Sequence, residues 1–229
     1  MERQVQYIVR LATTLLILGT LVLPALADSH ITPKPTEVKA GLFRMDPAHT
    51  RVMFSVSHLG FSNYTAFFTK ADATLNFDPE NPAAMQLTAT VDPASVETLY
   101  PDPSFDFNAL IEGAEFLDAA QFPEMTFTST AIALTAPDTA DVTGDMTLHG
   151  VTKPVTLQVR FNGGYQGHPL DPGGARIGFS AEGVLKRSDF GVSFGIPVPP
   201  DTIGVSDEVT VRIETEFMNP DAQGPEAGP

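Results

Sequence analysis

The sequence contains no cysteine and no tryptophan. Without a thiol it can form no disulfide, no cysteine-ligated metal site and no thiol nucleophile. Phosphate-binding glycine loops, Gly-x-Ser-x-Gly elbows and His-Glu-x-x-His helices are also missing. These absences exclude several classes of enzyme, and we predict no catalytic residue, no metal site and no cofactor.

Basic residues are scarce: Lys and Arg together number 13 against 28 Asp and Glu, a formal net charge of −15. A chain this acidic repels nucleic-acid phosphates and anionic membrane surfaces. We therefore exclude nucleic acid as a partner. The charge either steers the protein towards a basic partner or maintains its solubility, and solubility is the simpler interpretation.

Long apolar runs are equally scarce, and the clearest one lies at the N-terminus. Arg3 and Arg10 precede or border the apolar segment 11–23, and residues 25–27 (Ala-Leu-Ala) have the small-x-small pattern of a signal-peptidase site. The run is shorter than the roughly 20 residues of a membrane-spanning helix. We predict a cleaved signal peptide over residues 1–27, with an uncleaved anchor as the alternative. Export without disulfides is typical of the bacterial periplasm.

The rest of the chain suits one domain that does not span the membrane. Residues 28–40 lack periodicity and are predicted to be a flexible leader, and residues 219–229, rich in proline and glycine, a disordered tail. Between them, residues 41–218 show one sustained pattern, the alternation of apolar and polar side chains. Alternation with a period of two places successive side chains on opposite faces of a β-strand.

The alternation is clear in residues 51–58, where Val52, Phe54 and Val56 share a face that ends at His58. It recurs in the segments 85–91, 125–128, 142–149, 155–161, 177–182 and 209–217. The apolar parity changes between 64–68 and 71–77, which predicts a bulge or sharp bend at residues 69–70. Residues 149–154 are predicted to form a hairpin connection, and residues 105–120 one or two short helical turns.

Eight or nine such strands with almost no helix predict an all-β protein, either a closed antiparallel barrel or a sandwich. An outer-membrane barrel is disfavoured by the thin supply of aromatic residues for a girdle. The inward faces are rich in phenylalanine and carry no charge. Such faces either fill their own core or surround an apolar molecule, and periodicity alone favours the filled core. The segment 187–191 (RSDFG) is either a turn closed by an ion pair or a polar latch at the barrel mouth.

Four parts of the chain, taken in order, resemble the YceI-like family of periplasmic polyisoprenoid-binding proteins. They are the opening segment 46–60, the helix-to-strand segments 115–118 and 121–127, the hairpin 148–155, and the segments 187–191 and 206–209. The resemblance extends from about residue 43 to residue 217. It implies an antiparallel lipocalin-like β-barrel of about eight strands, with one or two short helices, that encloses a long isoprenoid chain.

The resemblance favours a ligand cavity over a filled core. We expect a non-enzymatic periplasmic carrier or store for an isoprenoid lipid of the polyprenyl or quinone type. The predicted ligand-binding residues are Phe54, Val56, His58, Phe68, Phe127, Met146, Leu148, Phe161, Phe179 and Phe190. The expected partners are this lipid and, in a homodimer, a second copy of the chain.

Two alternatives stay open. One is a small hydrolase or isomerase that acts on a lipid, with His58 and Asp189 as acid and base. The other is a non-catalytic, stress-related module that binds a protein partner and has a solid core. A structure distinguishes the solid core from the cavity directly.

Overall fold

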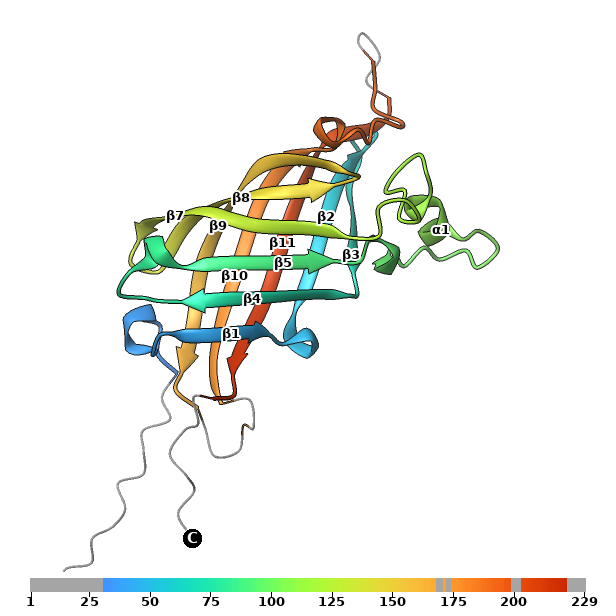
Figure 1. The fold of residues 1–229 in the computed structure, drawn as a ribbon. Coiled ribbons are helices and arrows are strands. Elements are labelled where there is room, and N and C mark those ends of the chain that lie inside the picture. The colour runs from blue at the N-terminus through green and yellow to red at the C-terminus, as the bar shows by residue number, and fades with distance from the viewer. Residues whose placement is uncertain (1–30, 168–170, 172–173, 199–202, 222–229) are drawn as a thin grey trace, which may run out of the picture.

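The computed structural model describes residues 31–167, 171, 174–198 and 203–221 (Figure 1). The predicted signal peptide, residues 1–27, lies outside the described residues, as does the predicted tail beyond residue 221. Among the described residues, no helix is both long enough and apolar enough to cross a membrane.

Eleven strands of one sheet make up most of the described chain. Their bounds are β1 (Gly41–Met45), β2 (Arg51–His58), β3 (Ser62–Phe68), β4 (Ala71–Phe77), β5 (Gln86–Val91), β6 (Val96–Glu97), β7 (Met125–Ala136), β8 (Thr139–Leu148), β9 (Val151–Tyr165), β10 (Ala175–Lys186) and β11 (Val205–Asn219). One α-helix, α1 (Phe107–Glu112), lies between β6 and β7. Short 3-10 helices are η1 (Pro35–Glu37), η2 (Pro47–His49), η3 (Pro82–Ala84), η4 (Pro93–Ser95) and η5 (Arg187–Phe190).

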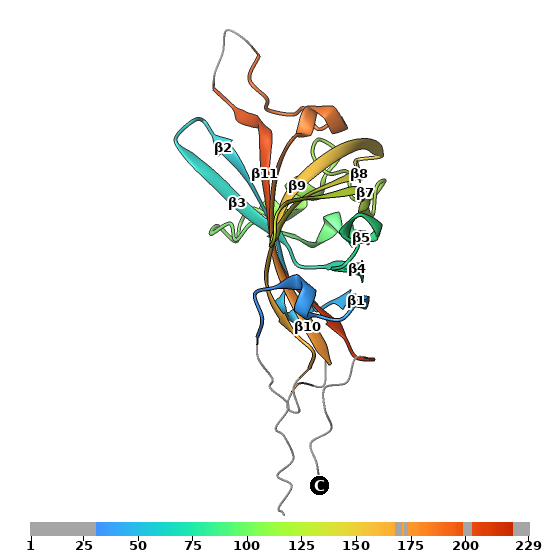
Figure 2. The ribbon, with the colours of Figure 1, turned by 90° about the vertical axis from the view of Figure 1, so that its left-hand side faces the viewer.

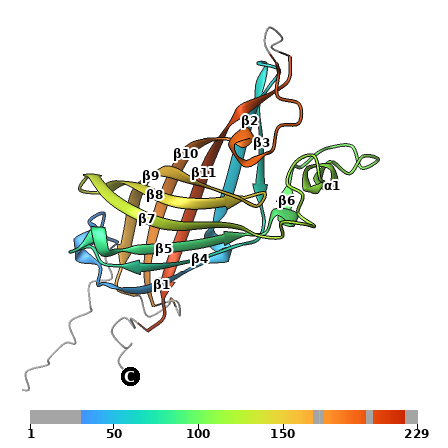
Figure 3. The ribbon, with the colours of Figure 1, turned by 45° about the horizontal axis from the view of Figure 1, so that its top comes forward.

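The sheet closes into a barrel because β11 pairs with β2 along most of its length and with β1 near its end. β1 and β2 act as one strand bent at η2, and β3 and β4 as another bent at residues 69–70, since β2 pairs with β3 and β1 with β4. With each bent pair counted once and the two-residue β6 set aside, eight strands surround the interior of the described chain. Figures 2 and 3 show them curving around it.

The predicted antiparallel barrel of about eight strands is therefore confirmed, with every pairing between these strands antiparallel. The bend at residues 69–70 is also confirmed. There the backbone N–H of Thr69 leaves the sheet ladder and donates to the carbonyl of Ser95 at 3.0 Å. The bend lets one continuous segment serve two parts of the barrel wall.

The predicted hairpin after β8 is confirmed, but its turn is tighter than the six residues expected. His149 and Gly150 both have positive φ, at 51° and 74°, as a two-residue type I′ turn requires. Residues 151–154 already belong to β9. Gly150 also could not carry a side chain without moving Phe122, whose ring carbon lies 2.4 Å from the position of a Cβ atom.

The expected flexible leader differs from the structure in its described part, residues 31–40. Thr32 forms a two-way backbone bridge with Gly164, with N···O distances of 2.8 and 3.0 Å. Val38 is only 2% exposed and packs in the apolar interior. This segment is ordered because it fills the end of the barrel and pairs with β9, contacts that a search for local periodicity does not reveal.

Candidate functional site: an apolar cavity inside the barrel

The barrel encloses a cavity of about 310 Å³. It is lined by residues of two apolar clusters of the interior. The first cluster contains Phe43, Phe77, Phe161, Ile177 and Phe217, and the second contains Met125, Leu148, Leu157, Leu185 and Phe190. Interiors of proteins are normally close-packed, so a void of this size in a small barrel requires an explanation.

Phenylalanine dominates the wall. Seven rings line the cavity, from β2, β3, β4, β7, β9, β10 and β11: Phe54, Phe68, Phe77, Phe127, Phe161, Phe179 and Phe217. Several touch one another, with centroids 5.3 Å apart for Phe54 and Phe68 and 5.6 Å for Phe161 and Phe179. The rings therefore pack side by side along the wall and leave the centre free.

Small residues on the inward faces create the room. Ala71, Ala73, Ala89, Ala181 and Gly183 line the cavity at positions where larger side chains would cross it. Gly144 on β8 does not itself line the cavity, but the ring of Phe127 packs directly over it. A Cβ atom at residue 144 would lie 2.4 Å from the ring of Phe127, so an alanine there would displace that ring.

The cavity reaches the surface at the connections β4–β5 and β7–β8. Pro79 and Pro82 contribute from the first connection and Pro137 and Asp138 from the second. Leu134, in the same part of the wall, is 57% exposed.

Among the residues that the structure describes, the lining contains no Lys, Arg or His, and its only carboxylates are Asp72 and Asp138, both exposed. A buried charge without a partner is strongly unfavourable. The interior therefore cannot hold a charged group. It can surround a hydrocarbon, because apolar contacts need shape and area rather than hydrogen bonds.

Six of the ten predicted ligand-binding residues line this cavity, namely Phe54, Phe68, Phe127, Met146, Phe161 and Phe179. Leu148 and Phe190 are instead buried in the second cluster, at 7% and 1% exposure. Val56 is half-buried outside the cavity, and His58 is exposed at the end of β2. Contact with a ligand remains a prediction for all ten residues.

The prediction missed several lining residues. Ala89, Val211, Phe77 and Phe217 have the same inward parity as the residues that it named, so the alternation could have found them. Pro35 and Thr36 also line the cavity, but they lie in the segment expected to be a flexible leader. No sequence pattern connects that segment with the barrel.

The alternative acid–base pair gains no support from the geometry. His58 and Asp189 are both exposed, and neither lines the cavity. His58 lies opposite Ser62 and Val205 in the sheet, whereas Asp189 lies in η5. A bound apolar chain in the cavity would be out of reach of both.

Arg187 is buried, with 6% of its surface exposed, and does not form a surface ion pair. Its side chain joins the two ends of the β10–β11 connection. Its guanidinium donates to the backbone carbonyls of Ser206 at 2.9 Å, Val205 at 3.0 Å, Phe194 at 2.7 Å and Val192 at 3.2 Å. Burial lowers the pKa of Arg187. Among the described contacts the Arg187 side chain binds carbonyls and no carboxylate, so an ion pair does not close the RSDFG segment; a polar latch at the barrel mouth stays a prediction.

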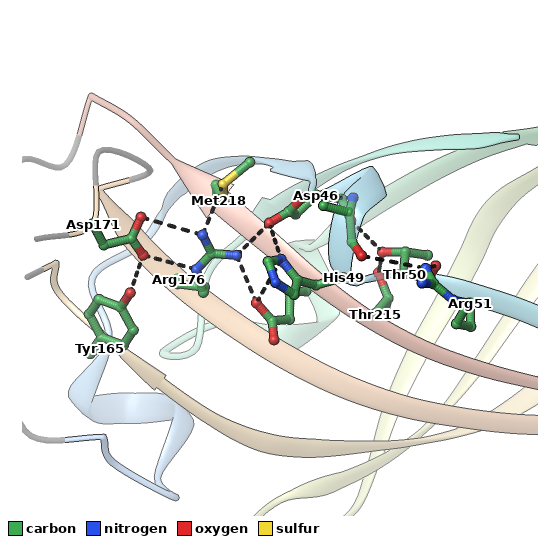
Figure 4. Close-up of polar contacts among 11 residues, drawn as sticks. Asp46, His49, Thr50, Arg51, Tyr165, Asp171, Arg176, Thr215 and Met218 are labelled. Atoms are coloured by element: carbon green, nitrogen blue, oxygen red, sulfur yellow. Dashed lines mark hydrogen bonds and ion pairs between the residues drawn. The ribbon is translucent and has the colours of Figure 1, made fainter. Parts of the chain in front are cut away.

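A second arginine holds the barrel together at its other end, on the outer face (Figure 4). Arg176 of β10 donates to Asp46 at 2.6 Å, to Glu216 at 2.7 Å and to Asp171 at 3.0 Å. We call this group the carboxylate clasp. It connects β10 and β11 with the segment after β1, at the point where the barrel closes.

Charge pairing in the clasp is strong. Burial alone would raise the pKa of Asp46, but hydrogen bonds from Arg176 and His49 lower it to about 2. Asp46, His49 and Glu216 lie close enough to hold a cation, yet Arg176 already occupies the facing oxygens of both carboxylates. Burial also raises the pKa of Tyr165, whose hydroxyl bonds to Asp171.

Comparisons with known proteins agree with this architecture. A family model described as "YceI-like domain" matches residues 43–217. A relative, Protein YceI of Escherichia coli O17:K52:H18, is 42% identical over 145 residues, which cover 63% of this chain and 71% of that protein. The crystal structure of Burkholderia cenocepacia BcnA is 28% identical, with a TM-score of 0.62 over 75% of this chain and 98% of that one. A polyisoprenoid binding domain from Saccharophagus degradans, 15% identical with a TM-score of 0.57 over 80% of this chain and 100% of that one, shares the fold.

Proposed function

Because the chain belongs to the YceI-like family, we propose that it binds one long apolar isoprenoid lipid inside the barrel and carries or stores it in the periplasm. The observation that supports this proposal best is the cavity of about 310 Å³, which seven phenylalanines and no basic side chain line within the described part of the chain. The role is one of binding, and no catalytic step is required. The polyprenyl and quinone classes are proposed because both combine a long hydrocarbon tail with a small head group.

The energetics favour such a ligand. Each Å² of apolar surface removed from water contributes roughly 25 cal/mol, so a tail that covers the seven rings is held without a hydrogen bond. The rings are already in contact with one another, so little ordering is needed on binding. A polar head group would remain near the opening at Pro82 and Asp138, where water can solvate it.

Mass spectrometry of organic extracts tests the proposal. The protein is purified from its own cells without denaturation, extracted, and its lipids identified against a mock purification. We expect an isoprenoid lipid in a ratio near one per chain. Repeated recovery of no lipid, or of phospholipids in the proportions of the membrane, contradicts the proposal.

A cavity-filling variant makes the test specific. Ala89 lies opposite Phe127 in the sheet and lines the cavity, so Ala89→Leu places new atoms where the tail would lie. We expect the variant to fold and to yield at least roughly tenfold less lipid, since binding free energy falls with the lost contact area. The matched control is Ala133→Leu on the exposed face of β7, which should retain the lipid.

A further inference from the structure

Large apolar side chains are exposed on the excursion between β6 and β7 that carries α1. Leu99 is 72% exposed, Phe105 48%, Tyr100 44% and Leu110 37%. We call these four residues the α1 patch. Figure 1 shows the excursion projecting from the barrel on the side away from the β4–β5 connection. The whole excursion lies within the described residues, and none of the four side chains lines the cavity.

The aromatic rings of the patch are joined to the barrel. The ring of Tyr100 lies 5.8 Å from that of Phe105 and 5.1 Å from that of Phe107, measured between centroids. Phe107 is half-buried and meets Tyr64 of β3 edge-on at 5.8 Å. The exposed rings are therefore one cluster with a fixed place beside β3.

The backbone under the patch is held by side chains. The N–H of Leu99 donates to the carboxylate of Glu97 at 2.8 Å, and the N–H and hydroxyl of Thr98 both donate to Asn108, at 2.9 and 2.6 Å. The hydroxyl of Tyr64 donates to the carbonyl of Thr98 at 3.1 Å. Leu99 itself has a φ of 52°, which a bulky residue rarely adopts. The excursion thus holds an exposed leucine in a strained conformation, as is typical of binding segments.

The surroundings of the patch carry negative charge. Residues 97–118 contain six Asp and Glu and no Lys or Arg. The longer stretch 71–152, all of it described, contains 14 of the 28 acidic residues of the chain and again no Lys or Arg. Lys70, which precedes this stretch, is paired with Asp92 at 3.3 Å. A partner that lies on the patch therefore meets a concentrated negative field.

This charge decides between the possible occupants. A second copy of the chain would bring the same negative charge to the patch, and an anionic membrane would repel it. Any bilayer would also take the carboxylates of Asp102 and Asp106, next to the rings in the sequence, out of water. Lys and Arg side chains, by contrast, pair with carboxylates and bind the faces of Tyr and Phe rings. Carboxylates spread along the excursion match the several cations of a polypeptide better than one small cation.

We propose that the α1 patch docks a basic protein segment. Its Lys or Arg side chains face the carboxylates of the excursion, and its apolar side chains lie on Leu99, Tyr100 and Phe105. The proposal goes beyond the proposed function and requires no lipid, because the patch does not line the cavity. It also gives the net charge of −15 a use besides solubility, namely attraction of this partner.

Fluorescence anisotropy of a labelled peptide tests the patch. The probe is a synthetic peptide that repeats Gly-Lys-Leu-Lys, and two matched peptides replace each Leu by Ser or each Lys by Glu. We expect the full chain to bind the probe at least roughly tenfold more tightly than either matched peptide, because each of these lacks one of the two kinds of contact.

A variant of the apolar side chains locates the binding. Leu99→Ser/Phe105→Ser should bind the probe roughly tenfold more weakly, because two large apolar side chains are lost from the patch. The matched control is Ile31→Ser/Leu42→Ser. These two residues are 73% and 52% exposed at and before β1, outside the excursion, so the control should bind as the wild type does.

A second variant removes charge and keeps the apolar surface. Asp102→Asn/Asp106→Asn should bind about fivefold more weakly at low salt, and added salt should shrink the difference. Asn caps a helix as well as Asp does, so α1 keeps its cap at residue 106. The matched control, Asp78→Asn/Glu80→Gln, makes the same change of charge in the β4–β5 connection and should bind nearly as the wild type does.

The proposal is overturned if the wild type does not bind the probe. It is also overturned if patch variants and controls weaken binding equally, which would show a general attraction of cations to an acidic chain. Circular dichroism checks that each variant is folded, and if Leu99→Ser/Phe105→Ser is not, the variant of Asp102 and Asp106 decides.

Two further measurements distinguish the other occupants. Sedimentation velocity would show a dimer that Leu99→Ser/Phe105→Ser turns into a monomer if the patch docks a second copy. Cosedimentation with phosphatidylcholine vesicles would be lost in the same variant if the patch docks on a bilayer. Either result, without binding of the probe by the wild type, overturns the basic partner, whereas a monomer that binds the probe and not the vesicles supports it.

Discussion

Phe43 and Phe127 occupy equivalent inward positions on two strands of the same barrel, yet they have different surroundings. Phe43 is fully buried, with its ring edge-on to Phe77 at 5.7 Å, and it does not line the cavity. Phe127 is half-buried and faces open space next to Ala89. The same residue type on the same face thus builds a filled core in one region and a wall in another. The difference lies in what surrounds each ring: Phe43 packs within the first cluster, whereas Phe127 lies at the cavity.

The largest loss in the free energy of unfolding is expected for a substitution at Phe43. Phe43→Ala removes a ring from a packed cluster and leaves a void, so we expect a loss of about 3–5 kcal/mol in the free energy of unfolding. Urea denaturation followed by circular dichroism measures it. A loss below about 1 kcal/mol would show that the first cluster is not packed as tightly as its burial indicates.

The next largest loss in the free energy of unfolding is expected for a substitution in the carboxylate clasp. Arg176→Leu leaves Asp46, Asp171 and Glu216 facing one another without a cation, which we expect to cost about 3 kcal/mol. The matched control is Arg212→Leu, which breaks a solvent-exposed pair with Glu182 and should leave the stability almost unchanged. Equal midpoints for the two variants in urea would contradict a closing role for the clasp.

A pH titration examines the same clasp without removing the arginine. The pKa of Asp46 is lowered from 3.8 to about 2 on folding, so its stabilisation is complete above about pH 4 and is lost as the pH falls towards 2. The expected contribution is about 2 kcal/mol. The Asp46→Asn variant should show that much less acid dependence between these values. Parallel stability profiles for variant and wild type would rule the effect out.

The smallest effect on stability is expected in the cavity wall. Phe127→Ala should cost about 1–2 kcal/mol, because the ring is half-buried and its loss enlarges an existing space. Lipid recovered from this variant should nevertheless fall, whereas any folded Phe43→Ala protein should retain its lipid. The distinction between the two regions would be contradicted if, in urea unfolding and lipid extraction, Phe127→Ala lost more stability than Phe43→Ala and kept its lipid while Phe43→Ala lost it.

Local sequence patterns were sufficient to predict the strands of the barrel, but they did not predict which inward residues line the cavity. Alternation located the strands, a change of parity located the bend at residues 69–70, and His149-Gly150 located a hairpin turn. Leu148 has the parity of a lining residue but is covered by the second cluster. Whether an inward residue meets a ligand or a neighbour depends on what lies across the barrel, which no local pattern records.

Contacts with the backbone were also beyond prediction. Arg187 donates hydrogen bonds to backbone carbonyls. Every residue type has such a carbonyl, so the sequence does not show which ones a side chain will contact. Thr32 is held by a bridge to Gly164 of β9, which is more than a hundred residues away in the sequence. Val38 is held by the apolar interior of the barrel. The charges of the clasp were visible in the sequence, but their meeting depends on closure of the barrel.

The proposed function requires a hydrocarbon tail in the space among Phe54, Phe127 and Phe179. A crystal structure of the protein purified from its own cells, with no lipid added, tests it most directly. We expect continuous elongated density along these rings, beginning near Pro82 and Asp138. Rings turned inward to close the space, with no such density, would contradict it.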